Sequence, residues 1–138
     1  MNTNTLNMIL KLKQWQEELE KQKFVEMLSE RHKLELYLKE LKGRLDSVTF
    51  LKEATSEKIV SIFDEIQYLT NQLIEVQELI KKIDEEVEKQ RQLYEEAFKE
   101  RKKIEQLYDK LITTIKMQRE KLEEKLILDV FTGRIRSE

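Results

Sequence analysis

The sequence predicts an all-α protein, a long antiparallel two-helix coiled coil (an α-helical hairpin) that forms one domain over residues 1–138. Three observations support this. Of the 138 residues, 39% are charged, none is proline and two are glycine, a composition typical of long helices. Apolar residues recur every seven positions along most of the chain, which keeps one seam facing a partner helix. The repeat fails once, where a turn would fit.

The second helix, expected at about 57–132, carries the longest repeat. Ten heptads place these residues at position a: Ile59, Ile66, Leu73, Ile80, Val87, Tyr94, Arg101, Tyr108, Ile115 and Leu122. Arg101 at position a, and Gln90 and Gln118 at position d, interrupt the apolar stripe. Such polar residues either set the register, or mark a stretch that awaits another protein. We expect Gly133 to cap the C-terminal end of this helix.

The first helix, expected at about 4–48, has a seam of its own. Its members are Phe24, Leu38 and Leu45 at position a, and Met27, Leu34, Leu41 and Val48 at position d. Nearer the N-terminus, an apolar face in a different phase consists of Met8, Leu12, Trp15 and Leu19. This change of phase predicts a slip of the repeat at about residues 20–24.

The expected turn lies at about 49–56, where the heptad repeat fails. Serine and threonine residues there can cap helix ends through local hydrogen bonds. Leu45 and Ile59 are nevertheless two heptads apart, so both seams share one register. A single uninterrupted helix in a parallel homodimeric rod, acting as a scaffold or spacer, therefore stays an alternative.

A hairpin with this turn leaves part of the second helix without a partner. Residue-for-residue pairing covers the second helix to about residue 100, so about thirty residues, or roughly 48 Å, are expected to overhang. The overhang would carry five seam residues: Ile104, Tyr108, Leu111, Ile115 and Leu122. Burying these side chains would contribute about 10 kcal/mol in total, so we expect the overhang to be either frayed in the free protein or buried in a partner.

The sequence offers no site for catalysis, for a cofactor or for a metal ion. Cysteine is absent, and the single histidine, His32, lies on a charged surface without converging ligands. We therefore expect a protein that is not an enzyme. The net charge of −2 argues against nucleic-acid binding. No signal peptide or membrane-spanning stretch is evident, which predicts a cytoplasmic protein.

Three segments resemble the FliJ family, the small coiled-coil proteins of the flagellar type III export apparatus. They are "IQYLTNQLIEVQELI", "QRQLYEEAFKERKKIEQLYDKL" and "EEKLILDVFTGRI". In the last segment Leu128, Asp129 and Arg134 fit the family pattern, whereas Val130 replaces an acidic residue. The related stalk proteins of virulence injectisomes share the architecture, and the sequence does not separate the two systems. A prefoldin-type hairpin chaperone is a further alternative.

The resemblance implies a cytoplasmic stalk whose paired termini enter the pore of the hexameric flagellar export ATPase and promote its activity. It also implies contacts with the cytoplasmic domain of the membrane export gate protein and with export chaperones. The chain would then be peripheral to the inner membrane through these partners. Expected partner-binding residues are Met8, Leu12, Arg101, Lys102, Lys103, Ile104, Tyr108, Leu111, Ile115 and Leu122.

Overall fold

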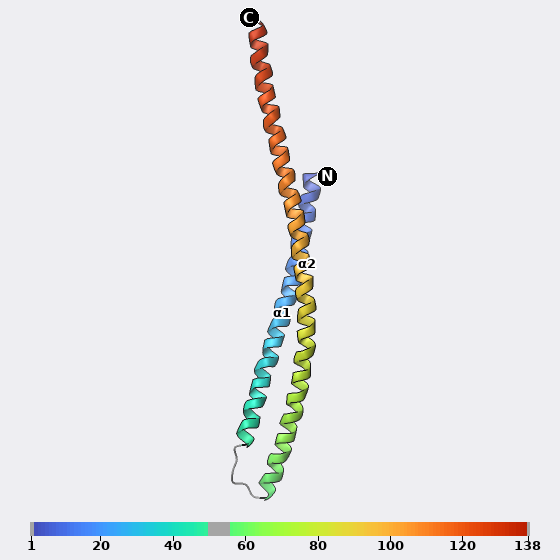
Figure 1. The fold of residues 1–138 in the computed structure, drawn as a ribbon, viewed down its shortest axis with the longest axis vertical. Coiled ribbons are helices and arrows are strands. Elements are labelled where there is room, and N and C mark those ends of the chain that lie inside the picture. Colours follow the sequence, from blue (N-terminus) through green and yellow to red (C-terminus); the bar gives the residue numbers. More distant parts are fainter. Residues whose placement is uncertain (1, 50–55, 138) are drawn as a thin grey trace. The chain divides into compact units, whose positions relative to one another are not determined.

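Two long α-helices make up the described chain. The computed structural model describes residues 2–49 and 56–137, with side chains at 2–48 and 58–133. Helix α1 spans Thr3–Thr49 and helix α2 spans Ser56–Ser137 (Figure 1). The two helices pack against each other, and no strand occurs in the described ranges, so the predicted all-α helical hairpin is confirmed. In these ranges neither helix has an apolar stretch long enough to cross a membrane.

The N-terminal end of α1 has a side-chain cap, whereas α2 lacks the glycine cap that the sequence predicted at Gly133. Asn2 caps α1, since its side-chain Oδ1 accepts a hydrogen bond of 3.1 Å from the Asn4 N–H and its carbonyl accepts one from Leu6. The expected turn at about 49–56 falls mostly on residues 50–55, outside the described residues. At the other end, the expected cap at Gly133 is wrong. Helix α2 continues through Gly133 without the left-handed backbone that a glycine cap requires.

Tertiary contacts divide the chain into two compact units. The 19–95 unit pairs the later part of α1 with the first part of α2. The terminal unit consists of the residues up to Glu18 and those from Glu96 onward. Each unit therefore contains one segment of each helix, and each is described separately below.

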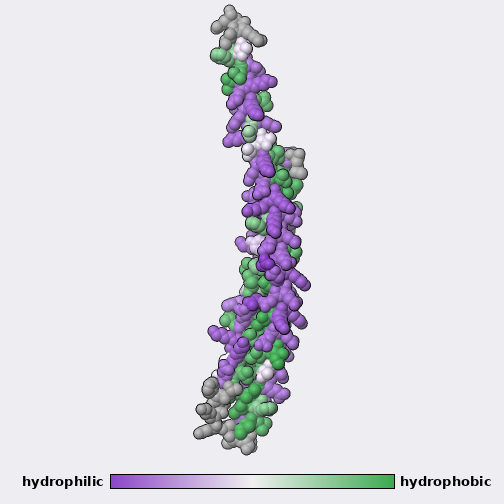
Figure 2. All heavy atoms as spheres, in the orientation of Figure 1, coloured by the Kyte–Doolittle hydropathy of each residue, from purple (hydrophilic) through white to green (hydrophobic). Residues whose placement is uncertain are grey.

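The core of the 19–95 unit consists of the predicted seam residues. Leu41 and Leu69 are 1% and 0% exposed, and Val48 and Val76 are buried beside them. Six half-buried residues pack around this cluster: Leu38, Leu45, Ile62, Ile66, Leu73 and Ile80. Figure 2 shows hydrophobic atoms, in green, along the line where the two helices of this unit meet. Burial of a and d residues from both helices stabilises the antiparallel pair.

Polar residues on the seam of this unit are paired across the helices. The Gln90 side chain is buried, and its Nε2 donates hydrogen bonds to the Glu20 carbonyl oxygen, at 3.1 Å, and to the Glu20 carboxylate. Arg31, also on the seam, donates to the Asp84 carboxylate. Gln90 is thus satisfied inside the chain, which favours the reading that it sets the register rather than awaiting a partner.

In the terminal unit, α1 covers more of α2 than the sequence predicted. Leu6 and Leu10 are buried, and four residues of the expected overhang are half-buried rather than free: Ile104, Tyr108, Leu111 and Ile115. The ion pairs Lys13–Glu100 and Glu17–Arg101 set the register, which places the first turns of α1 beside this stretch. From 116 to 133 every side chain is exposed. The uncovered part of α2 therefore begins at about residue 116, about fifteen residues later than expected. The reason is that α1 lies beside a later part of α2 than residue-for-residue counting from the turn predicts.

The predicted slip of the heptad repeat at residues 20–24 is also wrong. Leu10 is two heptads before Phe24, and Leu6 is three heptads before Met27, so one phase runs along α1. The positions between them that face α2 hold Lys13, Glu17 and Glu20. Polar partners on α2 satisfy these side chains, so the seam continues through positions that hydrophobicity alone does not reveal.

Candidate protein-binding surface

The described residues show no clustered polar site of the kind that catalysis requires. Among them, no three His, Asp or Glu side chains gather where they would hold a metal ion. His32 is exposed, and its Nδ1 lies 4.0 Å from a carboxylate oxygen of Glu35 on the same helix. Two apolar grooves stand out on the described surface, and both lie in the terminal unit.

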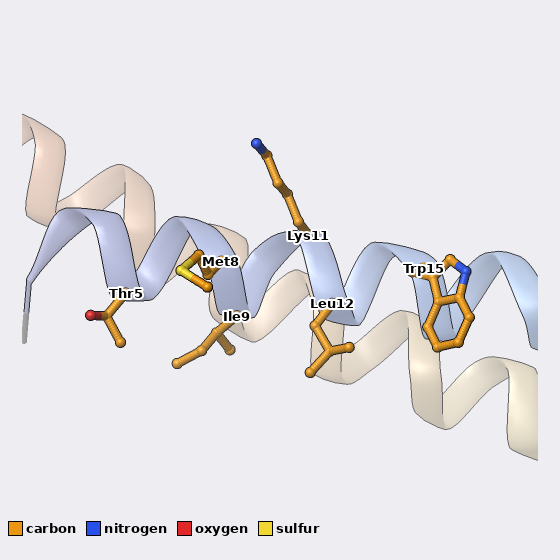
Figure 3. Close-up of a pocket in the computed structure, with 6 residues that line it drawn as sticks. All are labelled: Thr5, Met8, Ile9, Lys11, Leu12 and Trp15. Atoms are coloured by element: carbon orange, nitrogen blue, oxygen red, sulfur yellow. The ribbon is translucent and has the colours of Figure 1, made fainter.

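The first is a groove along α1, here called the N-terminal groove. Its lining residues are Thr5, Met8, Ile9, Lys11, Leu12 and Trp15 (Figure 3). Met8 is 71% exposed and Trp15 is 60% exposed, although both are large apolar side chains. They are exposed because Leu6 and Leu10 occupy the face of α1 that packs on α2, and Met8, Leu12 and Trp15 lie on another face.

The second feature is an apolar face on the last turns of α2, here called the C-terminal face. It consists of Leu126, Ile127, Val130 and Phe131, which line a shallow groove. All four side chains are more than half exposed. Figure 2 shows hydrophobic atoms gathered near this end of α2, beside hydrophilic ones. Apolar side chains that lie together on an exposed helix face are candidates for contact with another protein.

The C-terminal face is out of phase with the seam of α2. Beyond Ile115 the seam positions hold Gln118, Leu122 and Lys125, and Leu122 is exposed. The residues of the C-terminal face therefore do not occupy the a and d positions of the heptad repeat that forms the seam. Among the described residues, all side chains from 116 to 133 are exposed, so the hairpin itself leaves the C-terminal face uncovered.

The basic cluster at 101–103 is partly engaged within the chain. Arg101 donates a hydrogen bond of 2.6 Å from Nε to Glu17 and another to Glu105, and these bonds raise the pKa of Arg101 above its ordinary value. Lys102 lies over the Phe98 ring, with Nζ 5.2 Å from the ring centroid, while Lys103 is exposed. Of the three cations, Lys102 and Lys103 present charge to solvent.

The residues expected from the sequence to bind a partner thus fall into two groups. Five are exposed: Met8, Leu12, Lys102, Lys103 and Leu122. The other five are half-buried inside the terminal unit: Arg101, Ile104, Tyr108, Leu111 and Ile115. Six apolar residues that line the two grooves were not among the expected partner-binding residues: Ile9, Trp15, Leu126, Ile127, Val130 and Phe131. Their three- and four-residue spacing, off the main seam, is the signal that could have found them.

The N-terminal groove and the C-terminal face are both candidate protein-binding surfaces. Both apolar features lie on helices, have few polar groups and are shallow, which suits a helical or flat apolar partner better than a small molecule. No family model, curated protein or solved structure gives a significant match to this chain.

Proposed function

We propose that this chain is a coiled-coil stalk that binds a protein ring, as the FliJ resemblance implies for the hexameric export ATPase. The observation that supports the proposal best is the exposed end of α2. Its side chains are exposed from 116 to 133, and the C-terminal face lies within this stretch. An uncovered helical segment of this kind is marginal in water unless tertiary contacts stabilise it.

Burial of the exposed end of α2 would offset much of the free-energy cost of binding a partner. The four residues of the C-terminal face and Leu122 are each between 57% and 68% exposed. Full burial of one fully exposed side chain of this kind contributes about 1.5–3 kcal/mol, so covering the exposed part of all five would contribute about 4–9 kcal/mol, which is of the same order as the cost of association. The exposed Lys102 and Lys103 would add a salt-dependent attraction if the ring is acidic.

In this proposal the terminal unit binds the export ATPase and promotes its assembly and activity. Other surfaces would contact the cytoplasmic domain of the export gate protein and the export chaperones. The protein would act in the cytoplasm, peripheral to the inner membrane through these partners. The parallel homodimeric rod is not favoured, because α1 and α2 pack against each other within one chain.

The test is a paired comparison of two double variants. Ile127→Ser/Phe131→Ser alters the C-terminal face, whereas Val60→Ser/Phe63→Ser alters two similarly exposed residues in the 19–95 unit. We expect the first variant to weaken binding to the flagellar export ATPase at least tenfold and to reduce stimulation of ATP hydrolysis. The second should leave both unchanged.

Circular dichroism melting separates binding from folding in this test, since all four altered side chains are exposed and each variant should melt like the parent chain. Equal binding by the parent and the Ile127→Ser/Phe131→Ser variant would exclude the C-terminal face as the ATPase site. The same measurement with an injectisome ATPase distinguishes the two export systems, because the cognate ring should bind more tightly.

A further inference from the structure

Helix α1 carries two apolar stripes in the terminal unit, and only one of them is covered. Leu6 and Leu10 are buried, whereas Met8, Leu12 and Trp15 are half exposed or more. The exposed residues follow each other at intervals of four and three, the spacing of a coiled-coil seam. We propose that this second stripe binds the same stripe of a second copy of the chain, so that two chains associate in antiparallel orientation through the N-terminal groove.

The charges beside the stripe complement each other in such a dimer. Lys11 and Glu18 are one heptad apart, so they flank the stripe on the same edge. When Leu12 of each copy packs against Trp15 of the other, the geometry of an antiparallel pair brings Lys11 of each copy beside Glu18 of the other. Twofold symmetry then produces two identical ion pairs.

Lys11 and Glu18 are accessible for these pairs. Both side chains are exposed, and Figure 3 shows Lys11 extending from the helix at the edge of the groove, away from Ile9 and Leu12. In the described part of the chain, neither residue takes part in an ion pair, although their neighbours Lys13 and Glu17 do. The residues that are not needed for the hairpin are thus the ones that would pair between copies.

Other arrangements of the two stripes lack this complementarity. An antiparallel pair shifted by one heptad would pack Leu12 against Met8 and would place the two Lys11 side chains opposite each other, where they repel. A parallel pair would bring Lys11 beside Gln16, which carries no charge. The flanking charges therefore select both the antiparallel orientation and its register.

The dimer should be weak and reversible. Each copy contributes three large apolar side chains, so the interface buries less than the roughly 1,000 Å² that a stable complex needs. We expect half of the chains to be paired at a concentration of about 10–500 µM. The dimer is independent of the proposed function, although it would compete with any other partner for Met8 and Leu12.

Sedimentation equilibrium of the full chain over about 5 µM to 1 mM tests the proposal, with tryptophan fluorescence as a second readout. Trp15 is the only tryptophan, so its emission reports on this stripe alone. We expect the mass to rise toward that of a dimer while the emission shifts to the blue, because Trp15 becomes buried against Leu12. Leu12→Asp should abolish both changes. The matched control, Ile127→Asp on the C-terminal face, should abolish neither.

Charge exchange tests the antiparallel register. Lys11→Glu and Glu18→Lys should each weaken the dimer about threefold to tenfold, since each replaces two attractive pairs by repulsive ones. The double variant Lys11→Glu/Glu18→Lys should restore the parent affinity, as should a mixture of the two single variants. High salt should reduce these differences.

Several outcomes would overturn the proposal. A monomeric mass with unshifted emission at the highest concentration would exclude self-association. A dimer that survives Leu12→Asp would form through another surface. The antiparallel arrangement would be refuted if Lys11→Glu and Glu18→Lys left the dimer affinity unchanged. It would also be refuted if the double variant Lys11→Glu/Glu18→Lys did not restore the parent affinity.

Discussion

Replacing Leu69 by alanine should destabilise the hairpin more than almost any other leucine-to-alanine change in the chain. Leu69 is fully buried in the core of the 19–95 unit, in contact with the cluster of Leu41, Val48 and Val76. Removing a buried leucine side chain costs about 2.7–5 kcal/mol, depending on how far the surroundings relax. Two helices relax more easily than a closed core, so we expect about 3 kcal/mol.

The assay is urea denaturation followed by circular dichroism at the helical band. Because stability falls linearly with denaturant, the loss appears as a lower midpoint at a similar slope. The matched control is Leu122→Ala, the same chemical change on the same helix at a position that is 60% exposed. It should change stability by less than about 0.5 kcal/mol.

A loss below about 1 kcal/mol for Leu69→Ala would refute the reasoning, because it would mean that the seam of the 19–95 unit does not hold the helices together. A loss of similar size for Leu122→Ala would be equally damaging, since it would show that the exposed end of α2 is already buried against something. The two variants together therefore test the seam and the overhang.

Three further predictions concern the terminal unit. Hydrogen exchange should be faster for the amides of 116–133 than for those of 62–90, and equal protection would contradict an uncovered helix end. Arg101→Ala should lower the free energy of unfolding by about 1–2 kcal/mol, because Glu17 stays half-buried without its partner; an unchanged urea midpoint would count against this seam pair. Cysteines replacing Lys13 and Glu100, whose side chains form an ion pair of 3.0 Å, should be joined within one chain by a short crosslinker, and crosslinking only between chains would contradict the antiparallel pairing.

The candidate binding surface was only partly predictable. Met8, Leu12 and Leu122 were expected to bind a partner, and the structure leaves all three exposed. Ile104 and Leu111 were expected to be free, yet they are half-buried. The error lies in the pairing of the two helices: the ion pairs Lys13–Glu100 and Glu17–Arg101 place α1 beside a later part of α2 than residue-for-residue counting from the turn predicts.

The N-terminal stretch shows a second limit of sequence reasoning. Two apolar stripes compete for the seam there, one containing Leu6 and Leu10 and the other containing Met8, Leu12 and Trp15. The second stripe is the more hydrophobic one, so the sequence predicted that it forms the seam and that the heptad repeat slips at about residues 20–24. The structure uses the first, because it keeps the phase of the rest of α1 and lets Glu17 meet Arg101.

The sequence by itself determined the fold class and the helices, because both depend on local properties of the chain. Composition and a seven-residue period dictate long helices with one apolar seam, and residues such as Leu41 and Leu69 are buried as that period requires. Only the tertiary structure decided the register of the two helices, and with it which apolar side chains stay uncovered. Register depends on pairs between residues far apart in the chain, such as Gln90 with Glu20, and a periodic pattern matches itself equally well after a shift of one heptad. Polar contacts across the seam remove that ambiguity, and they exist only once the helices have met.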